Sequence, residues 1–140
     1  AGKVAQATGG ELYAITPAES YTSADLDWND KQSRSSVEMS DPASRPAIGG
    51  EALNADGYDV IFLGYPVWWN LAPRIVNTFV ESHDLNGKTV IPFATSGSSG
   101  IANSAAALKE TYPDIDWKEG KLLNRASAGD IREWVGKLGY

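Results

Sequence analysis

Two loop-forming segments carry the residues of this chain that are best suited to hold a ligand. Each follows directly on a strongly apolar run: residues 64–69 (GYPVWW) hold two adjacent tryptophans, and residues 95–100 (TSGSSG) hold only hydroxyl residues and glycines. Indole rings stack on planar ligands, whereas glycines let a backbone approach closely and hydroxyls bond carbonyls, ribityl oxygens or phosphate. A flat aromatic cofactor with a polyhydroxyl tail would need both segments.

Each segment also has a plainer interpretation. Neighbouring residues point in different directions, so one of Trp68 and Trp69 could fill the core while the other covers a sheet edge. The loop position and Pro66 favour instead a wall for a planar ring. Clusters of glycine and serine are often simple loops or helix caps, so residues 95–100 alone are a weak indication of a ligand site.

Catalysis by an activated serine has little support in the sequence. Ser99 does not fit a nucleophile elbow, because Ile101 stands where that motif has its second glycine. The single histidine, His83, is expected near the end of a helix, where a solvated capping role is favoured.

Metal and nucleotide sites are not indicated either. Asp25, Asp27 and Asp30 lack the glycine and the terminal glutamate of a calcium loop, so we expect a solvated acidic turn. The chain has no cysteine, which excludes disulfides, iron–sulfur ligation and thiol catalysis. It also has no GxxxxGKS/T or GxGxxG pattern that would cradle a nucleoside triphosphate or a dinucleotide.

Length and charge limit the partners. The 140 residues suffice for a single domain, 1–140, with a proper core. A net charge of −6 argues against nucleic acid, which requires a basic surface. No apolar run reaches the ~18 residues of a membrane span and no signal-peptide pattern is present. We therefore expect no membrane partner and a place in the cytoplasm.

The first half of the chain predicts one helix and two strands. Residues 2–8 resemble the last turns of a helix, which Gly9 and Gly10 would end with a left-handed exit. Residues 12–15, with Leu12, Tyr13 and Ile15, predict a short strand. Residues 60–63 predict a strand buried on both faces.

A long polar connection separates these two strands. Residues 21–50 lack strong periodicity, and such connections are usually functional or mobile. Trp28 and Met39 are expected to be its large apolar anchors. The charged residues of this connection that could pair with one another are Arg34, Glu38 and Arg45.

The second half predicts a regular alternation of elements. From Ala72 onwards the apolar residues have helical spacing, with Pro73 suited to the first turn. A strand at 89–94, a helix at 101–111 and a short edge strand at 117–123 follow, and Ser127 should cap a final helix. Such alternation predicts an α/β fold with a mostly parallel sheet, in which both ligand-suited segments leave the carboxyl ends of strands.

These segments, taken together, resemble a known family. The chain is similar to the flavodoxin-like family of small FMN proteins over essentially its whole length. The stretches that carry the resemblance are 24–30 (ADLDWND), 33–39 (SRSSVEM), 44–48 (SRPAI), 64–69 (GYPVWW), 72–73 (AP), 77–79 (NTF), 93–97 (FATSG) and 117–124 (WKEGKLLN). The resemblance implies a doubly wound parallel sheet of order 2-1-3-4-5, with FMN at the point where the strand order reverses.

The resemblance also implies a cofactor site. Its ring-binding side would hold Pro66, Val67, Trp68 and Trp69, and its hydrogen-bonding side would hold Thr95, Ser96, Gly97 and Ser98. The connection that contains Arg34 and Glu38 would cover the flavin ring. If an Arg34→Ala variant had unchanged turnover and unchanged flavin potential, this covering role would be ruled out.

The chain departs from the family at its beginning. Family members begin with a β-strand and a Ser/Thr-Gly phosphate loop, whereas this sequence starts near the end of the helix that follows them. The absent strand is central in the family, so the strands at 12–15 and 60–63 would lose the neighbour between them. Three outcomes are open: the segment belongs to a longer protein, a second copy fills the gap, or the flanking strands pair directly. We expect the first.

Three functions follow from the resemblance. One is an FMN oxidoreductase that passes electrons or hydride from a reduced donor to a small acceptor. Another is an electron carrier without substrate chemistry, whose acidic surface would steer it to a basic redox partner protein. The third is a truncated domain that does not bind FMN, because it lacks the charge-assisted bonds of a phosphate loop. A homo-oligomer is also compatible with the sequence.

Overall fold

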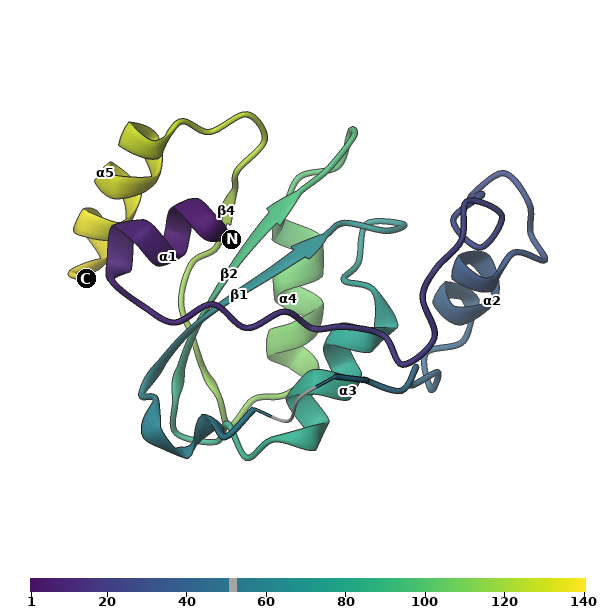
Figure 1. Ribbon diagram of the computed structural model, residues 1–140, viewed down its shortest axis with the longest axis horizontal. Helices are drawn as coiled ribbons and strands as arrows, with labels where there is room; N and C mark the ends of the chain where they lie inside the picture. The colour runs from purple at the N-terminus through teal and green to yellow at the C-terminus, as the bar shows by residue number, and fades with distance from the viewer. Residues whose placement is uncertain (51–52) are drawn as a thin grey trace.

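A parallel sheet lies at the centre of the computed structural model, which describes residues 1–50 and 53–140 (Figure 1). Its long strands are β1 (Val60–Pro66) and β2 (Thr89–Thr95). The short strands β3 (Asp116–Trp117) and β4 (Lys121–Leu122) both pair with β2, on the side opposite β1. All the pairings are parallel, which confirms the predicted α/β class with a parallel sheet.

Helices cover the sheet on both sides, and α3, α4 and α5 follow β1, β2 and β4 respectively along the chain. Their bounds are α1 Gly2–Thr8, α2 Arg34–Ser40, α3 Arg74–Ser82, α4 Ala102–Thr111 and α5 Ala128–Leu138, with a short 3-10 helix at Ala55–Gly57. Figure 1 shows α3 and α4 on one side of the sheet and α1 beside α5 on the other. Among the described residues, no helix combines the length and the apolar character needed to cross a membrane.

Strand β2 contributes residues to the apolar clusters on both faces of the sheet. Its alternate residues point to opposite faces: Val90 and Ala94 join the apolar cluster under α3 and α4, whereas Ile91 and Phe93 join the cluster under α1 and α5. Val90 and Ile91 are completely buried. Because both faces are covered, β2 is apolar along its whole interior, as expected of a parallel strand.

Several predicted helix ends are confirmed. Gly9 has a φ of 70° and ends α1, and the Ser127 side chain accepts a bond from Asp130 N while the Asp130 carboxylate accepts one from Ser127 N. This reciprocal pair satisfies amide groups that the first turn of α5 leaves without partners. Pro73 is the residue before α3 rather than a member of its first turn.

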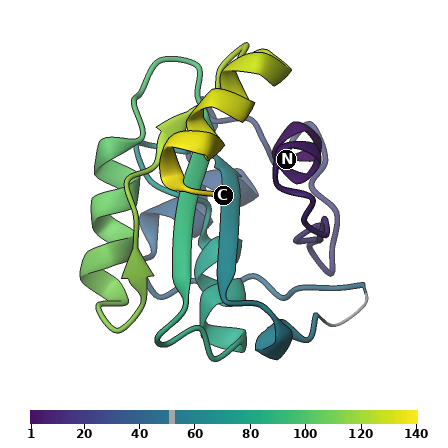
Figure 2. The ribbon, with the colours of Figure 1, turned by 90° about the vertical axis from the view of Figure 1, so that its left-hand side faces the viewer.

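The strand predicted at residues 12–15 was wrong. This segment makes no ladder with β1, although Tyr13 packs against Phe79 of α3 with ring centroids 6.0 Å apart. Figure 2 shows the N-terminal segment standing apart from β1. An extended segment becomes a strand only when a neighbouring strand takes its amide and carbonyl groups, and here a groove replaces that neighbour.

The groove has a volume of about 1040 Å³ and runs along the open edge of β1. Its walls are α1, the segment 10–15 and β1 itself, and it extends as far as Pro66 and Thr95. Near the other end, the Tyr58 hydroxyl donates to the Glu11 carboxylate across it. The first residues of β1, Val60 to Phe62, are therefore only half-buried, in contrast to the predicted strand buried on both faces.

Other differences concern the long connection and the last strand. The sequence did not predict α2, whose first turn is capped by Ser33. Met39 is a buried anchor as predicted, but Trp28 is 69% exposed. The predicted edge strand at 117–123 is divided into β3 and β4, each two residues long.

Gly64 in β1 provides a test of core packing. A Cβ atom at this position would lie 2.4 Å from two atoms of the Phe93 ring, so the ring would have to move out of its cluster. We expect Gly64→Ala to lower the free energy of unfolding by about 1–3 kcal/mol, measured by urea denaturation.

A matched control lies in α5. Gly136 is exposed and a Cβ atom there would meet nothing within 4 Å, so Gly136→Ala should stabilise the protein by about 0.5–1 kcal/mol. If both substitutions stabilised the protein, the contact between Gly64 and Phe93 would not limit the packing of the sheet.

Candidate functional site

The register of β1 and β2 brings the two ligand-suited segments together. The strands pair residue by residue from Val60 and Thr89 to Pro66 and Thr95. Immediately beyond the ladder, Val67 N donates to Thr95 O at 2.9 Å. The two segments therefore leave the carboxyl edge of the sheet from adjacent points, which is where ligands bind in open α/β sheets.

The tryptophan segment closes in a tight turn. Trp68 N donates to Leu71 O at 2.8 Å and Leu71 N donates to Trp68 O at 2.9 Å. The two residues between them have positive φ values, 47° for Trp69 and 64° for Asn70, as in a type I′ turn. Asparagine tolerates this left-handed conformation, whereas for tryptophan it is uncommon and strained.

The strained turn presents one indole to solvent. The Trp69 side chain is 48% exposed, and Trp68 is half-buried, so neither indole lies in the core. Asn103 of α4 steadies the turn because its Nδ2 donates to Asn70 O at 2.9 Å. Strain that is held by surrounding contacts is typical of functional positions, since folding alone gains nothing from it.

The hydroxyl segment is clamped by Asn124, a residue that lies well beyond it in the chain. Asn124 Oδ1 accepts from Ser96 N at 2.8 Å, and Asn124 Nδ2 donates to Ser96 O at 2.6 Å. This bidentate pair mimics a strand neighbour and fixes the backbone where β2 ends. Reasoning from the sequence gave Asn124 no such role, because its partner lies 28 residues away.

The remaining groups of this segment are free to bind a ligand. Within the described residues, the hydroxyls of Thr95, Ser98 and Ser99 make no hydrogen bond to the protein, while Ser98 N donates to Ser96 Oγ at 3.3 Å. A Cβ atom at Gly97 would meet nothing within 4 Å, so the space beside this backbone is open. Such donors and such space suit the polar edge and the hydroxylated chain of a ligand.

The predicted charged cluster is only partly formed. Arg34 Nε lies 3.1 Å from Glu38 Oε2, whereas Arg45 pairs with Glu81 at 2.9 Å instead. Both side chains of the Arg45–Glu81 ion pair are partly exposed to solvent, so the pair contributes little to the stability of the fold. The pKa of the Glu81 carboxyl is lowered, most strongly by the hydrogen bond from Tyr112 and to a smaller extent by the hydrogen bond and the charge of Arg45.

His83 follows α3 directly, as predicted, but it is not simply solvated. Its Nδ1 lies 2.8 Å from Phe79 O, and the centroids of the His83 and Phe79 rings are 4.6 Å apart.

In the predicted acidic turn, Asp25 Oδ2 accepts a hydrogen bond from Thr22 N at 2.9 Å and lies 4.0 Å from Arg34 Nη1. His83, Asp25 and Arg34 all lie outside the two segments that leave the strands.

Comparisons with known proteins show which structures the chain resembles. Two solved structures are named "putative flavoprotein" and resemble the chain over nearly its whole length. That from Bacteroides eggerthii DSM 20697 is 61% identical with a TM-score of 0.94, covering 99% of this chain and 87% of that one. That from Bacteroides uniformis ATCC 8492 is 56% identical with a TM-score of 0.94, covering 96% and 86%.

A more distant structure shares only the fold. It is a flavoprotein from Lactobacillus acidophilus NCFM, solved in complex with FMN; it is 16% identical with a TM-score of 0.58, and the match covers 89% of this chain and 75% of that one. No curated protein matches the chain at a significant level. The sequence profile named Flavodoxin matches residues 1–138. Since this match spans nearly every residue of the parallel α/β fold, the chain belongs to the flavodoxin family.

Proposed function

We propose that residues 1–140 form one flavin-binding domain of a cytoplasmic redox protein that uses FMN. The observation that carries the proposal is the exposed Trp69 indole, held in a strained turn that starts beside the free hydroxyls of Thr95 and Ser98. FMN is the ligand of the distant flavoprotein with the same fold, and the family is named for such proteins.

The residues at the strand exits fit a flavin. Pro66, Val67, Trp68 and Trp69 would flank the ring system, because an indole and a flavin are both planar and gain from stacking. Thr95, Ser96, Gly97 and Ser98 would bond the polar edge of the ring and the ribityl chain. The flavin itself would accept and release electrons, and the protein would set its orientation and its surroundings.

Two roles in electron transfer are consistent with this site. An oxidoreductase would use the exposed face beside Trp69 to admit a small acceptor such as a quinone. An electron carrier would instead meet a basic partner protein, which the net charge of −6 favours. Turnover of a quinone with a nicotinamide donor would support the enzyme, whereas electron exchange that slows strongly with added salt would support the carrier.

We also propose that a further strand of the same polypeptide fills the groove beside β1. The alternation of a strand directs the amides of Ile61, Leu63 and Tyr65 toward β2, as Val67 N is directed to Thr95 O. The amides of Phe62 and Gly64 therefore face the groove. Both similar Bacteroides proteins contain residues without a counterpart here, since the alignments cover 87% and 86% of their length.

This additional strand would complete the flavin site. The groove extends to Pro66 and Thr95, so a strand parallel to β1 would deliver its following loop beside the two exit segments. A loop at that place is suited to hold phosphate with backbone amides. Residues 1–140 alone would then hold the ring and the ribityl chain but not the phosphate.

The proposed function leads to three predictions, the first of which concerns the preference of the chain for FMN or riboflavin. Because a phosphate contact contributes ~1.5–3 kcal/mol per charge-assisted bond, a chain without this contact should bind FMN and riboflavin with affinities within about threefold. Both affinities can be measured from the quenching of flavin fluorescence during a titration. Binding of FMN more than a hundredfold tighter than riboflavin would show that residues 1–140 already hold a phosphate site.

The second prediction concerns Trp69. Glycine adopts a positive φ without strain, so Trp69→Gly should change the free energy of unfolding by no more than about 1 kcal/mol. The same substitution removes the stacking surface and should weaken riboflavin binding about tenfold. Trp28→Ala, at another exposed tryptophan, is the control and should change neither quantity. Unchanged affinity in Trp69→Gly would remove Trp69 from the site.

The third prediction concerns the open edge of β1. Amide hydrogen exchange in residues 1–140 should be at least about tenfold faster for Phe62 and Gly64 than for Leu63 and Tyr65, which are bonded to β2. Equal protection of all four amides would mean that residues 10–15 pair with β1 directly. Protection that rises with protein concentration would mean that a second copy fills the groove.

A further inference from the structure

Tyr21 connects the long segment before α2 with the strained tryptophan turn. Its ring meets the Trp68 indole edge to face, with centroids 5.6 Å apart and planes at 78°. Aromatic pairs of this geometry contribute ~0.5–1.5 kcal/mol beyond the area they bury. Trp68 is also the residue whose amide and carbonyl close the turn on Leu71. The Tyr21 ring therefore supports the side chain of the residue whose backbone closes the turn.

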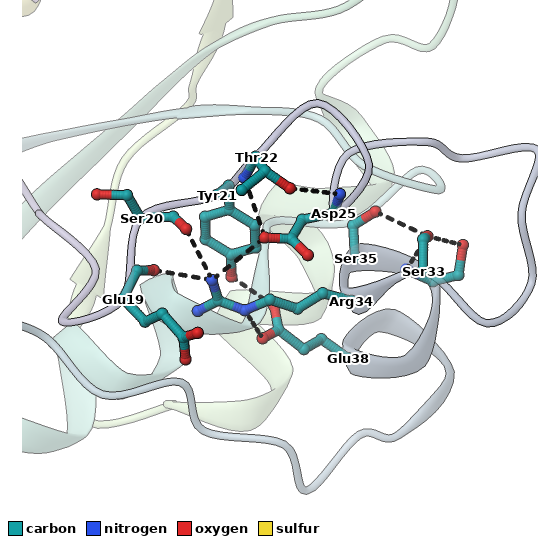
Figure 3. A network of polar contacts seen from close by, with 10 residues as sticks. Glu19, Ser20, Tyr21, Thr22, Asp25, Ser33, Arg34, Ser35 and Glu38 are labelled. Carbon is teal, nitrogen blue, oxygen red and sulfur yellow. Dashed lines mark hydrogen bonds and ion pairs between the residues drawn. The ribbon is translucent and has the colours of Figure 1, made fainter.

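Two side chains, Glu38 and Arg34, in turn hold Tyr21 (Figure 3). Its hydroxyl donates to Glu38 Oε1 at 2.5 Å, and the Arg34 guanidinium carbon lies 3.8 Å from the centre of its ring. Arg34 Nε donates to Glu38 Oε2 at 3.1 Å, so the two residues that hold Tyr21 are also bonded to each other. Burial and then the hydrogen bond to Glu38 raise the pKa of Tyr21, which keeps its phenol protonated as a donor.

The residues that hold Tyr21 are themselves fixed to the fold. Arg34 Nη1 donates to Glu19 O at 2.8 Å, which fixes the chain just before Tyr21. At the far end of α2, Arg74 of α3 donates to Met39 O at 2.9 Å. The Met39 side chain is buried. The segment is thus attached to α3, the helix that follows the tryptophan turn in the chain.

We infer that Tyr21 is a positioning residue for the Trp68–Trp69 turn, held in place by Arg34 and Glu38. It fixes the Trp68 indole and so keeps Trp69 in the strained conformation that faces a ligand. This role rests on the proposed function for its effect on flavin, but not for its effect on the turn. In this arrangement the Arg34–Glu38 pair holds Tyr21 in place, which differs from the covering of the flavin ring predicted from the sequence.

The test reads the turn directly, without any ligand. Amide exchange of Trp68 and Leu71 reports the two hydrogen bonds that close the turn. Replacing the ring in Tyr21→Leu should accelerate exchange at both amides roughly fivefold, the size expected for one lost aromatic pair. Leu63, in the middle of β1, is the internal reference for global stability, and its exchange should change much less.

Control variants separate positioning from general loosening of the segment. Trp28→Ala lies in the same segment but is 69% exposed, and it should leave the exchange of Trp68 and Leu71 unchanged. Tyr21→Phe keeps the ring on Trp68 and loses the bond to Glu38, so its effect should be smaller than that of Tyr21→Leu. If Tyr21→Leu does not fold, Arg34→Met removes the cation from the ring and should accelerate the same two amides.

Flavin titration of the same variants completes the experiment. Riboflavin affinity should fall in Tyr21→Leu by about the factor by which the turn loosens. Exchange at Trp68 and Leu71 that is no faster in Tyr21→Leu than in Trp28→Ala would overturn the inference. If the unmodified chain binds no flavin, the proposed function fails, but the exchange rates still decide whether Tyr21 positions the turn.

Discussion

The parallel pairing of β1 with β2 is the constraint on which the rest of the molecule depends. It runs without interruption from Val60 and Thr89 to Pro66 and Thr95, and β2 is buried on both faces by helices. Because the two strands end side by side, the segments that follow them must start from the same place. Their common origin, rather than any contact between their side chains, makes one site out of two loops.

Each loop is then held by a residue from a distant part of the chain. Asn124 clamps Ser96, Asn103 bonds the carbonyl of Asn70, and Tyr21 packs on Trp68. These supports come from after β4, from α4 and from the segment before α2 respectively. A site assembled in this way is rigid at its base, while the surfaces that would meet a ligand stay free of internal bonds. Such preorganisation lowers the entropy that a ligand would otherwise have to remove.

The sequence predicted what depends on local chemistry. The cap at Ser127, the exit at Gly9 and the strand at 89–94 are set by residues within a few positions, and all three are confirmed. The strand at 12–15 was wrong because strand formation needs a partner, which no local pattern reveals. Helix α2 was missed because its support comes partly from Arg74, 35 residues away from Met39. The adjacent tryptophans led to the prediction of a binding surface, but the positive φ of Trp69 and the clamp at Asn124 depend on the three-dimensional fold.

The open edge of β1 has a consequence beyond ligand binding. Unpaired strand edges are templates for pairing with other chains, and proteins usually guard them with charges or proline. Between Val60 and Tyr65 this strand carries no charged residue, and Pro66 stands only at its end. A strand that filled the groove, as we propose, would therefore protect this edge from pairing with other chains as well as complete the sheet. The same strand would then have a second importance during folding, because β1 would be open to other chains until it was covered.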